Sequence, residues 1–338
     1  MMKILAIETS CDESSVAIVD SGFHILSNVI SSQIDLHRRF GGVVPELASR
    51  AHQEALLPLI EQALEEAQCV IEDIDAFAVT YGPGLSGALM VGLSCAKSLS
   101  LFFEKPLIGV NHVEAHIYAN FMGQKAILPC VAMIVSGGHT LLAKVSGWGK
   151  YEILGQTRDD AAGEAFDKVA NMLKLGYPGG PIVDRLAKQG DRKKIFFPRA
   201  KVKGSPLCFS FSGLKTAVLY HLREKKEEEI KAAIPDICAS FQEAVVDVLC
   251  SKSFKALEDC GLGHLAVGGG VSMNSRLREA MMDLGEEKKV QVTFPGKNLS
   301  ADNAAMIGGL AYEKWSAGIV DDLELEVDPC LPISNWVK

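Results

Sequence analysis

The sequence has no CxxC pair and only nine scattered cysteines among its 338 residues. Disulfide frameworks typically show an even number of regularly spaced cysteines in short secreted chains. Several of these cysteines, such as Cys95, Cys238 and Cys250, lie inside apolar patterns instead. We therefore expect reduced core cysteines and a cytoplasmic protein.

The sequence also lacks a long apolar run without charge. The longest apolar helix candidate, Gly87 to Phe103, is interrupted by Lys97, and the first short apolar stretch runs directly into acidic residues. A membrane-spanning helix needs about 20 apolar residues, and a secretion signal has its own charged and apolar regions. We expect neither one, and a chain of this length with 48% hydrophobic residues can form two domains with real cores.

A surplus of positive charge is missing as well, because 34 basic residues face 42 acidic ones and the net charge is −8. This balance argues against a protein that binds nucleic acid through its overall charge. The segment 184–203 is a local exception. It contains eight basic residues against Asp184 and Asp191, and either a solvated surface or a local contribution to nucleic-acid binding is compatible with that pattern.

Short β-rich runs and helical patterns alternate in an order that occurs twice. The expected elements of the first half are strands at 4–7, 15–19 and 24–30, one kinked or two helices over 45–67, a strand at 76–80, a helix over 87–103, a strand at 107–110, and a helix from about residue 112. A second three-stranded meander follows at 131–135, 140–145 and 151–154.

Each meander has an unusually polar first turn. The first turn contains Asp12 and Glu13, two carboxylates available for acid/base chemistry, although a hydroxyl-rich hairpin has the same composition. The second is Ser136-Gly137-Gly138-His139-Thr140, which suits close approach of backbone amides to a phosphate. This duplication predicts an α/β protein with two actin-like, sugar-kinase or Hsp70-type domains and a nucleotide cleft between them.

We place the domain boundary between residues 125 and 126. The domain over 1–125 carries the histidine pair described below, and the domain over 126–338 carries the phosphate turn, a helical insertion and a last helix near the cleft. Glycine turns follow the strands at 76–80 and 264–267 and precede helices, where backbone amides can bind an anion. The first turn is not a Walker motif, because no Gly-Lys-Ser/Thr follows it. After the second turn, Asn274 is placed to bond a ribose or a base.

His112 and His116 are four residues apart within a plausible helix, which places both rings on one face. They are candidates to bind one transition-metal ion, although an isolated pair of this kind is also common on surfaces. Glu114 does not follow the first histidine directly, as it would in the HExxH metalloprotease motif. Asp302, just before the expected last helix, is either the helix N-cap or a third, carboxylate ligand.

Many motifs of the chain, in this order, resemble the bacterial TsaD family, whose older name is O-sialoglycoprotein endopeptidase. The motifs are IETSCDES, GGVVPELASRAH, GPGLSGAL, HVEAH, SGGHT, GEAFDK, PGGP, FSFSGLK, GGGVSMN and ADNAAM. The resemblance implies transfer of a threonylcarbamoyl group from threonylcarbamoyl-adenylate to N6 of adenosine 37 in tRNAs that read codons starting with A. Asn111 stands where many relatives have another histidine.

The resemblance also implies site residues, a cofactor and partners. It implies one divalent metal per subunit, Fe²⁺ first and Zn²⁺ or Mg²⁺ as alternatives, bound by His112, His116 and Asp302. The implied substrate contacts are Ile134, Val135, Ser136, Gly137, Gly138, Asp167, Gly180, Asp184 and Asn274. The implied partners are tRNA and proteins like TsaB and TsaE, with the donor made by a TsaC-type enzyme.

Three other functions remain compatible with the residues themselves. A small-molecule kinase of the same fold would use the same phosphate turns but has no use for His112 and His116. A metallopeptidase would need a base that Glu114 is misplaced to supply. A non-catalytic assembly subunit would not need the full set of metal and phosphate-turn residues.

Overall fold

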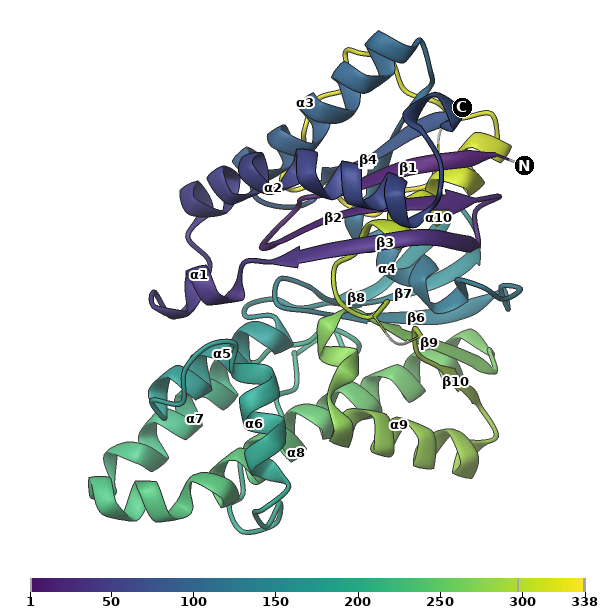
Figure 1. The fold of residues 1–338 in the computed structure, drawn as a ribbon. Coiled ribbons are helices and arrows are strands. Elements are labelled where there is room, and N and C mark those ends of the chain that lie inside the picture. The colour runs from purple at the N-terminus through teal and green to yellow at the C-terminus, as the bar shows by residue number, and fades with distance from the viewer. Residues whose placement is uncertain (1, 297, 337–338) are drawn as a thin grey trace. The chain divides into compact units, whose positions relative to one another are not determined.

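The structure, a computed structural model, describes residues 2–296 and 298–336 and divides into two compact α/β units. The first unit comprises Met1–Ala126, Trp148–Lys150 and Pro295–Lys338, and the second comprises Ile127–Gly147 and Tyr151–Phe294. Figure 1 labels the elements of both. Each unit is built on one five-stranded sheet.

The first sheet has the order β3-β2-β1-β4-β5. Its strands are β1 (Lys3–Glu8), β2 (Glu13–Asp20), β3 (His24–Ser32), β4 (Ala76–Gly82) and β5 (Leu107–Asn111). The first three form the expected antiparallel meander, and β4 and β5 add in parallel. The parallel strands need crossover connections, because each strand ends at one end of the sheet and the next parallel strand must begin at the other end.

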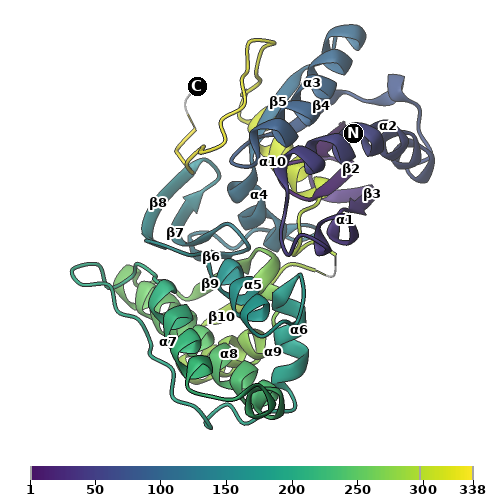
Figure 2. The same ribbon diagram turned by 90° about the vertical axis from the view of Figure 1, so that its left-hand side faces the viewer.

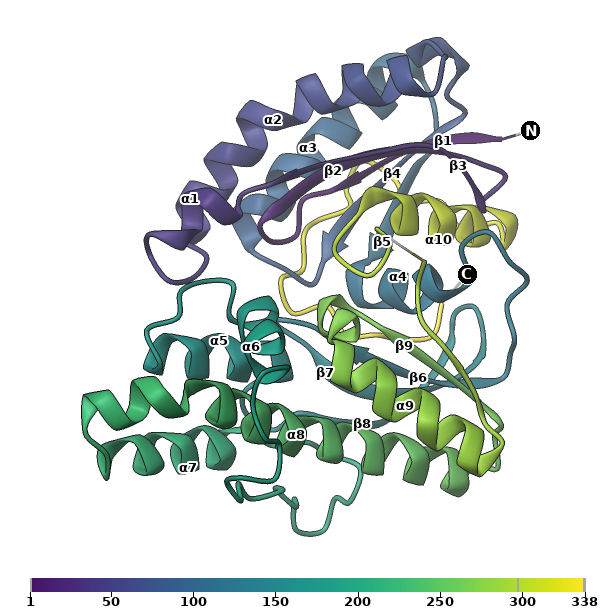
Figure 3. The ribbon, with the colours of Figure 1, turned by 60° about the horizontal axis from the view of Figure 1, so that its bottom comes forward.

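Helices cover both faces of this sheet, as Figure 3 shows. Alternate side chains of β1 point to opposite faces. Leu5 and Ile7 pack with α2 (Pro45–Glu66) and α3 (Ser86–Phe103). Ile4 and Ala6 pack with α4 (His112–Tyr118) and α10 (Ala304–Ser316). The short elements α1 (Ile34–Arg38), η1 (Ile71–Asp73) and η2 (Ala119–Phe121) complete this unit.

Of the described residues, only α3 forms a helix long and apolar enough to cross a membrane by length and composition. A third of it is buried, and Leu89, Leu93 and Ala96 are among the buried residues. Leu93 and Ala96 pack with side chains of β1 and β4, which is how a core helix of an α/β sheet packs.

The last helix belongs to the first unit, whereas the boundary at 125/126 had assigned it to the second. Met306, Ile307 and Leu310 of α10 are buried against the first sheet. A Cβ at Gly308 would lie 2.5 Å from Val19 Cγ2, so the glycine permits a close approach. Sequence order did not show this, because the apolar side of a helix does not specify which sheet it covers.

The chain after α10 also stays with the first unit. The amide of Asp321 donates to the carbonyl of Leu107, and the amide of Asp328 donates to that of Tyr81, over 2.8 and 2.9 Å. This segment, yellow in Figure 2, therefore runs along β4 and β5.

The second sheet has the order β10-β9-β6-β7-β8. Its strands are β6 (Cys130–Val135), β7 (Thr140–Gly147), β8 (Lys150–Gln156), β9 (His264–Gly268) and β10 (Gln291–Thr293). In both sheets the first strand lies in the middle, with the second and third on one side and the fourth and fifth on the other. The predicted duplication is confirmed.

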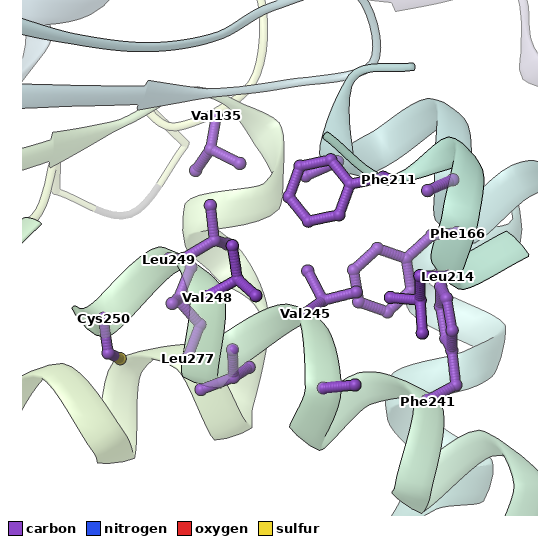
Figure 4. Packing of buried hydrophobic residues seen from close by; sticks show 14 of the residues in the cluster. Val135, Phe166, Phe211, Leu214, Phe241, Val245, Val248, Leu249, Cys250 and Leu277 are labelled. Atoms are coloured by element: carbon purple, nitrogen blue, oxygen red, sulfur yellow. The ribbon is translucent and has the colours of Figure 1, made fainter. Parts of the chain in front are cut away.

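The helices of the second unit share a core with its sheet. They are α5 (Ala162–Met172), α6 (Gly179–Ala187), α7 (Ser212–Arg223), α8 (Glu227–Cys260) and α9 (Ser275–Lys288), with the 3-10 turn η3 (Gly270–Met273) before α9 (Figure 3). In this core, α8 packs directly against β6, β7 and β9. Figure 4 shows Val135 of β6, Phe166 of α5, and Phe241 and Val245 of α8 in this core. Buried aromatic side chains thus join the strand that precedes the Ser136 turn to the helices around it.

Candidate functional site

The helix α4 presents its two histidines in the geometry that the sequence predicts. The side chain of Asn111 caps the helix by accepting bonds from the amides of Val113 and Glu114, over 2.9 and 3.1 Å. His112 and His116 follow one turn apart, and their ring centroids are 4.6 Å apart. The cap fixes where the helix begins and therefore which face carries both rings.

The Nε2 atoms of both histidines face Asp302. The distances to Asp302 Oδ1 are 3.6 Å from His112 and 3.0 Å from His116. One ligand atom from each of the three residues lies within 4.8 Å of the others. The two histidines are 5% and 0% exposed, so side chains 186 residues apart in the sequence form one buried donor set.

Asp302 is not the N-cap of α10, which was the alternative to a ligand role. Asn303 occupies that position, and its Oδ1 accepts a bond of 3.2 Å from the amide of Met306. The cap interaction is therefore supplied by the neighbouring residue, and the carboxylate of Asp302 is directed to the histidines instead.

The electrostatics of this donor set suit a cation. Burial lowers the pKa of His112, but the charges of Glu8 and Asp302 outweigh it and raise that pKa to about 9. Burial, followed by the charges of Asp302 and Asp12, raises the pKa of Glu13 to about 10. Clustered carboxylates beside two imidazoles form a site that a divalent cation would stabilise. The residues present fit such an ion.

The acidic turn between β1 and β2 is held by hydrogen bonds from a buried histidine. His52 of α2 donates from Nε2 to the carbonyl of Cys11 over 3.0 Å, and its Nδ1 lies 2.7 Å from Ser14 Oγ and 3.2 Å from Gln33 Nε2. Burial lowers the pKa of His52, which keeps the ring neutral. These contacts fix the backbone around Asp12 and Glu13.

The glycine turn of the second unit connects β6 to β7. The amide of Ser136 donates to the carbonyl of His139 over 2.8 Å, and Ser136 Oγ accepts from the amide of His139. Gly137 and Gly138 between them are exposed, and a Cβ at either position would meet nothing within 4 Å. The turn is open on its outer side, as a turn that binds a phosphate with its amides must be.

The first turn of α5 supports this glycine turn. The amide of Gly163 donates to the carbonyl of Ser136 over 3.1 Å. A Cβ at Gly163 would lie 2.6 Å from that oxygen and 2.8 Å from Gly137 Cα. Only glycine allows the helix and the turn to lie this close together.

The remaining predicted substrate contacts lie on neighbouring elements of the second unit. Asp167 Oδ1 accepts a bond of 2.7 Å from the amide of Gly179 at the start of α6. Asp184 Oδ1 accepts one of 2.8 Å from Ser275 Oγ at the start of α9. Gly180 has open space where a side chain would be.

Three predicted contacts are already engaged within the protein. Asn274 caps α9 by accepting from the amide of Leu277, and its Nδ2 donates to Gln242 Oε1 over 2.8 Å. Ile134 and Val135 are fully buried strand residues. The side chains of these two belong to the core, so only their backbone can meet a substrate.

A cavity of about 600 Å³ lies beside these residues in the second unit. Gln242 and Ser275, which bond Asn274 and Asp184, both line it. Lys188 and the ion pair of Arg276 with Glu243, whose atoms are 2.7 Å apart, complete much of its wall. Ligand pockets in proteins have about this volume.

Reasoning from sequence missed several residues of these sites. They are Glu8, Thr80, Gly163 and Gln242. Glu8 and Gly163 stand inside motifs that were singled out, yet nothing local distinguishes them from their neighbours. Thr80 ends an expected strand, and Gln242 lies within a helix.

Comparison with known proteins identifies a family. The model of the family TsaD, tRNA N6-adenosine threonylcarbamoyltransferase, matches residues 24–309. Proteins of that name from Clostridium beijerinckii and Clostridioides difficile are 53% and 49% identical to this chain over 333 and 332 residues, which is 98% of each chain in both alignments.

Two solved structures share the fold at low sequence identity. Full-length HypF in its phosphate- and nucleotide-bound form has a TM-score of 0.61 at 13% identity, and the match covers 93% of this chain and 46% of HypF. The activator of the 2-hydroxyisocaproyl-CoA dehydratase from Clostridium difficile, with bound ADPNP, has a TM-score of 0.53 at 16% identity over 94% and 97% of the two chains.

The duplicated sheets and their turns thus define a protein of the actin-like ATPase fold that carries a candidate metal centre on its first unit. Within that class, two findings identify the family. The TsaD family model matches residues 24–309, and relatives named for the same enzyme are about half identical in sequence over nearly the whole chain. The chain belongs to the TsaD family.

Proposed function

We propose that the protein transfers a threonylcarbamoyl group from threonylcarbamoyl-adenylate to N6 of adenosine 37 in tRNAs that read codons starting with A, with release of AMP. The convergence of His112, His116 and Asp302 in a member of the TsaD family carries this proposal. It makes the protein an acyltransferase of tRNA modification rather than a kinase.

The reaction needs positioning and charge stabilisation more than activation, since an acyl-adenylate is already reactive. The N6 amine attacks the carbonyl carbon, the bond from that carbon to the phosphate oxygen breaks, and AMP leaves with the electron pair. The amides of the exposed Gly137 and Gly138 bind the phosphate, and Asp167, Gly180, Asp184 and Asn274 surround the adenosine part. A divalent cation held by His112, His116 and Asp302 would polarise and orient donor oxygens.

We expect Fe²⁺ as the native ion, with Zn²⁺ and Mg²⁺ as alternatives, because two imidazoles and one carboxylate are a common ligand set for iron. Imidazole ligands suit Zn²⁺ equally, whereas Mg²⁺ prefers oxygen ligands. The transfer itself moves no electrons, so this set is needed for charge and geometry alone.

An in vitro transfer experiment tests the proposed activity. Synthetic threonylcarbamoyl-adenylate, unmodified tRNA and the partner proteins are incubated with the enzyme, and modified adenosine 37 is measured by mass spectrometry of the nucleosides. We expect modification that depends on the enzyme. Absence of product under conditions in which a Clostridium relative is active, together with ATP consumption on an alcohol or acid acceptor, would favour the small-molecule kinase instead.

Asp12 is the better candidate than Glu13 to accept the proton that the amine loses. Burial is the largest cause of the raised pKa of Glu13, and this cause persists when the site binds a cation, although the positive charge acts against it. Burial thus disfavours the ionised state that a base must have, and glutamine resembles the protonated state of Glu13. We expect Asp12→Asn to lower the transfer rate by about 10²-fold or more and Glu13→Gln to stay within about tenfold of wild type, both measured in single-turnover transfer. A larger loss in Glu13→Gln than in Asp12→Asn would reverse the assignment.

The basic segment after α6 is the part of the second unit that we propose to contact tRNA. Lys193 and Lys194 are exposed. Phe196 beside them is 85% exposed, with the guanidinium of Arg199 5.5 Å from its ring centre. Asp247 holds that guanidinium at 2.6 Å. Positive charge beside an exposed aromatic ring is the combination that binds phosphates and stacks on bases.

Reversing two charges of this segment tests its role. We expect Lys193→Glu with Lys194→Glu to weaken tRNA binding about tenfold at low salt and to flatten its salt dependence, because each lost phosphate contact removes one counterion release. The matched control, Lys225→Glu with Lys226→Glu, changes the net charge equally at the start of α8. Filter binding over a salt series measures both. If both double variants weakened tRNA binding equally, the effect would come from the net charge alone, and the proposed role of this segment would be wrong.

We further propose that the protein acts in the cytoplasm with TsaB-like and TsaE-like partners, on a donor made by a TsaC-type enzyme. The net charge of −8 supports a need for partners, since the basic segment is a small part of a surface that must bind a polyanion.

A further inference from the structure

A fully buried carboxylate, Glu8, stands at the end of β1 beside the candidate metal centre. Its Oε1 accepts a bond of 2.6 Å from the amide of Ser10. Its Oε2 accepts one of 2.6 Å from Thr80 Oγ1 and one of 3.0 Å from His112 Nδ1. Glu8 is 0% exposed, so this charge is stabilised by donors of the protein rather than by water.

We propose that Glu8 is a positioning residue that fixes the ring orientation and the tautomer of His112 for metal binding. The inference rests on the proposed metal centre and deepens it. An ionised carboxylate only accepts hydrogen bonds. His112 must therefore carry a proton on Nδ1, and its Nε2, which faces Asp302, is the nitrogen that can give up a proton to bind a cation.

The position of Glu8 is itself fixed by two contacts on different elements. The amide of Ser10 can only donate, so Oε1 has to be an acceptor. Thr80 lies on the neighbouring strand β4, and its hydroxyl reaches Oε2 across 72 residues of sequence. The pairing of Ile7 with Val79 in the sheet holds the two strands at this separation. The sheet thus holds the carboxylate of Glu8 in a fixed position beside His112 Nδ1.

The two histidines differ in this support. His116 Nδ1 is buried and has no hydrogen-bond partner among the described residues. His112 Nδ1 has Glu8, and Ser10 Oγ lies 3.1 Å from it as well. A carboxylate behind a ligating imidazole orients the ring and raises its basicity. Of the two histidines, His112 is therefore the one whose ring orientation is fixed by a carboxylate, and that carboxylate is Glu8.

Replacing Glu8 with glutamine places an NH₂ donor opposite the N–H donor of His112 Nδ1. The amide oxygen of the glutamine has to face the Ser10 amide, so its NH₂ group faces His112. His112 Nδ1 must then accept, so the neutral ring carries its proton on Nε2, and a cation can bind Nε2 only after this hydrogen bond is broken and the proton returns to Nδ1. We expect the affinity for Co²⁺, used as a spectroscopic probe, to fall about 10-fold to 100-fold in Glu8→Gln.

The matched control is Asp321→Asn. Asp321 is a carboxylate of the same unit that accepts a bond of 2.8 Å from the amide of Gly109, three residues before His112, without contact to the ligands in the hydrogen bonds described. We expect it to keep the Co²⁺ affinity within about threefold of wild type. If Glu8→Gln does not fold, Glu8→Asp replaces it, since the shorter side chain keeps the charge but withdraws it from His112.

Co²⁺ titration by absorbance measures the affinity, and ¹⁵N-histidine NMR of the metal-free protein reports whether Nδ1 of His112 carries a proton. A proton on His112 Nδ1 in wild type and none in Glu8→Gln, with weakened Co²⁺ binding, would support the proposal. Wild-type affinity in Glu8→Gln, while His112→Ala binds no Co²⁺, would overturn it and leave the metal centre intact. Equal Co²⁺ binding by His112→Ala and wild type would instead overturn the metal centre itself.

Discussion

Replacing His112 with alanine is expected to abolish tight metal binding and to lower threonylcarbamoyl transfer by at least about a hundredfold, which is roughly 3 kcal/mol of transition-state stabilisation. The substitution removes one of three candidate ligand atoms that lie within 4.8 Å of one another. It also leaves the buried charge of Glu8 without its bond to the imidazole, so some loss of stability accompanies the loss of metal.

The control for this variant is His264→Ala. His264 is a buried histidine of β9 whose ring bonds the carbonyl of Ile127 and the hydroxyl of Thr293. We expect it to reduce stability as well but to bind metal normally once folded. Metal content by mass spectrometry and modified adenosine 37 are measured for both. Equal modification by His112→Ala and wild type would keep the transferase but reduce the metal to a structural role.

Replacing Gly163 with valine is expected to lower kcat/KM for the adenylate donor by about a hundredfold while metal binding stays unchanged. The new Cβ would lie 2.6 Å from the carbonyl oxygen of Ser136, so the helix α5 and the glycine turn must separate. A shift of about 1 Å in a group that positions a substrate costs an effect of this size. Steady-state transfer at varied donor concentration measures it.

The matched control is Gly213→Val. Gly213 is the second residue of α7, as Gly163 is of α5, and a Cβ there would meet nothing within 4 Å. The two variants thus add the same side chain at the same helix position and differ in the presence of the turn. Near wild-type transfer by Gly163→Val would mean that the turn does not depend on this support.

The architecture could be predicted from the sequence because its signals are local. Apolar residues at spacings of two and of three to four, with glycines at the strand ends, gave both meanders and the order of the elements in each half. The four-residue spacing of His112 and His116 gave their common helix face in the same way. The resemblance to the TsaD family added the third candidate ligand, Asp302, which no spacing connects to the pair.

Tertiary structure alone decided how these parts meet. It assigned α10 to the first unit and chose Asn303 over Asp302 as the helix cap. It also placed Glu8 behind His112, 104 residues away. The pattern along a chain reports which side of an element is apolar and where it ends, because those depend on neighbouring residues. Which distant side chain a buried polar group bonds depends on the packed core, which forms only when the whole chain folds.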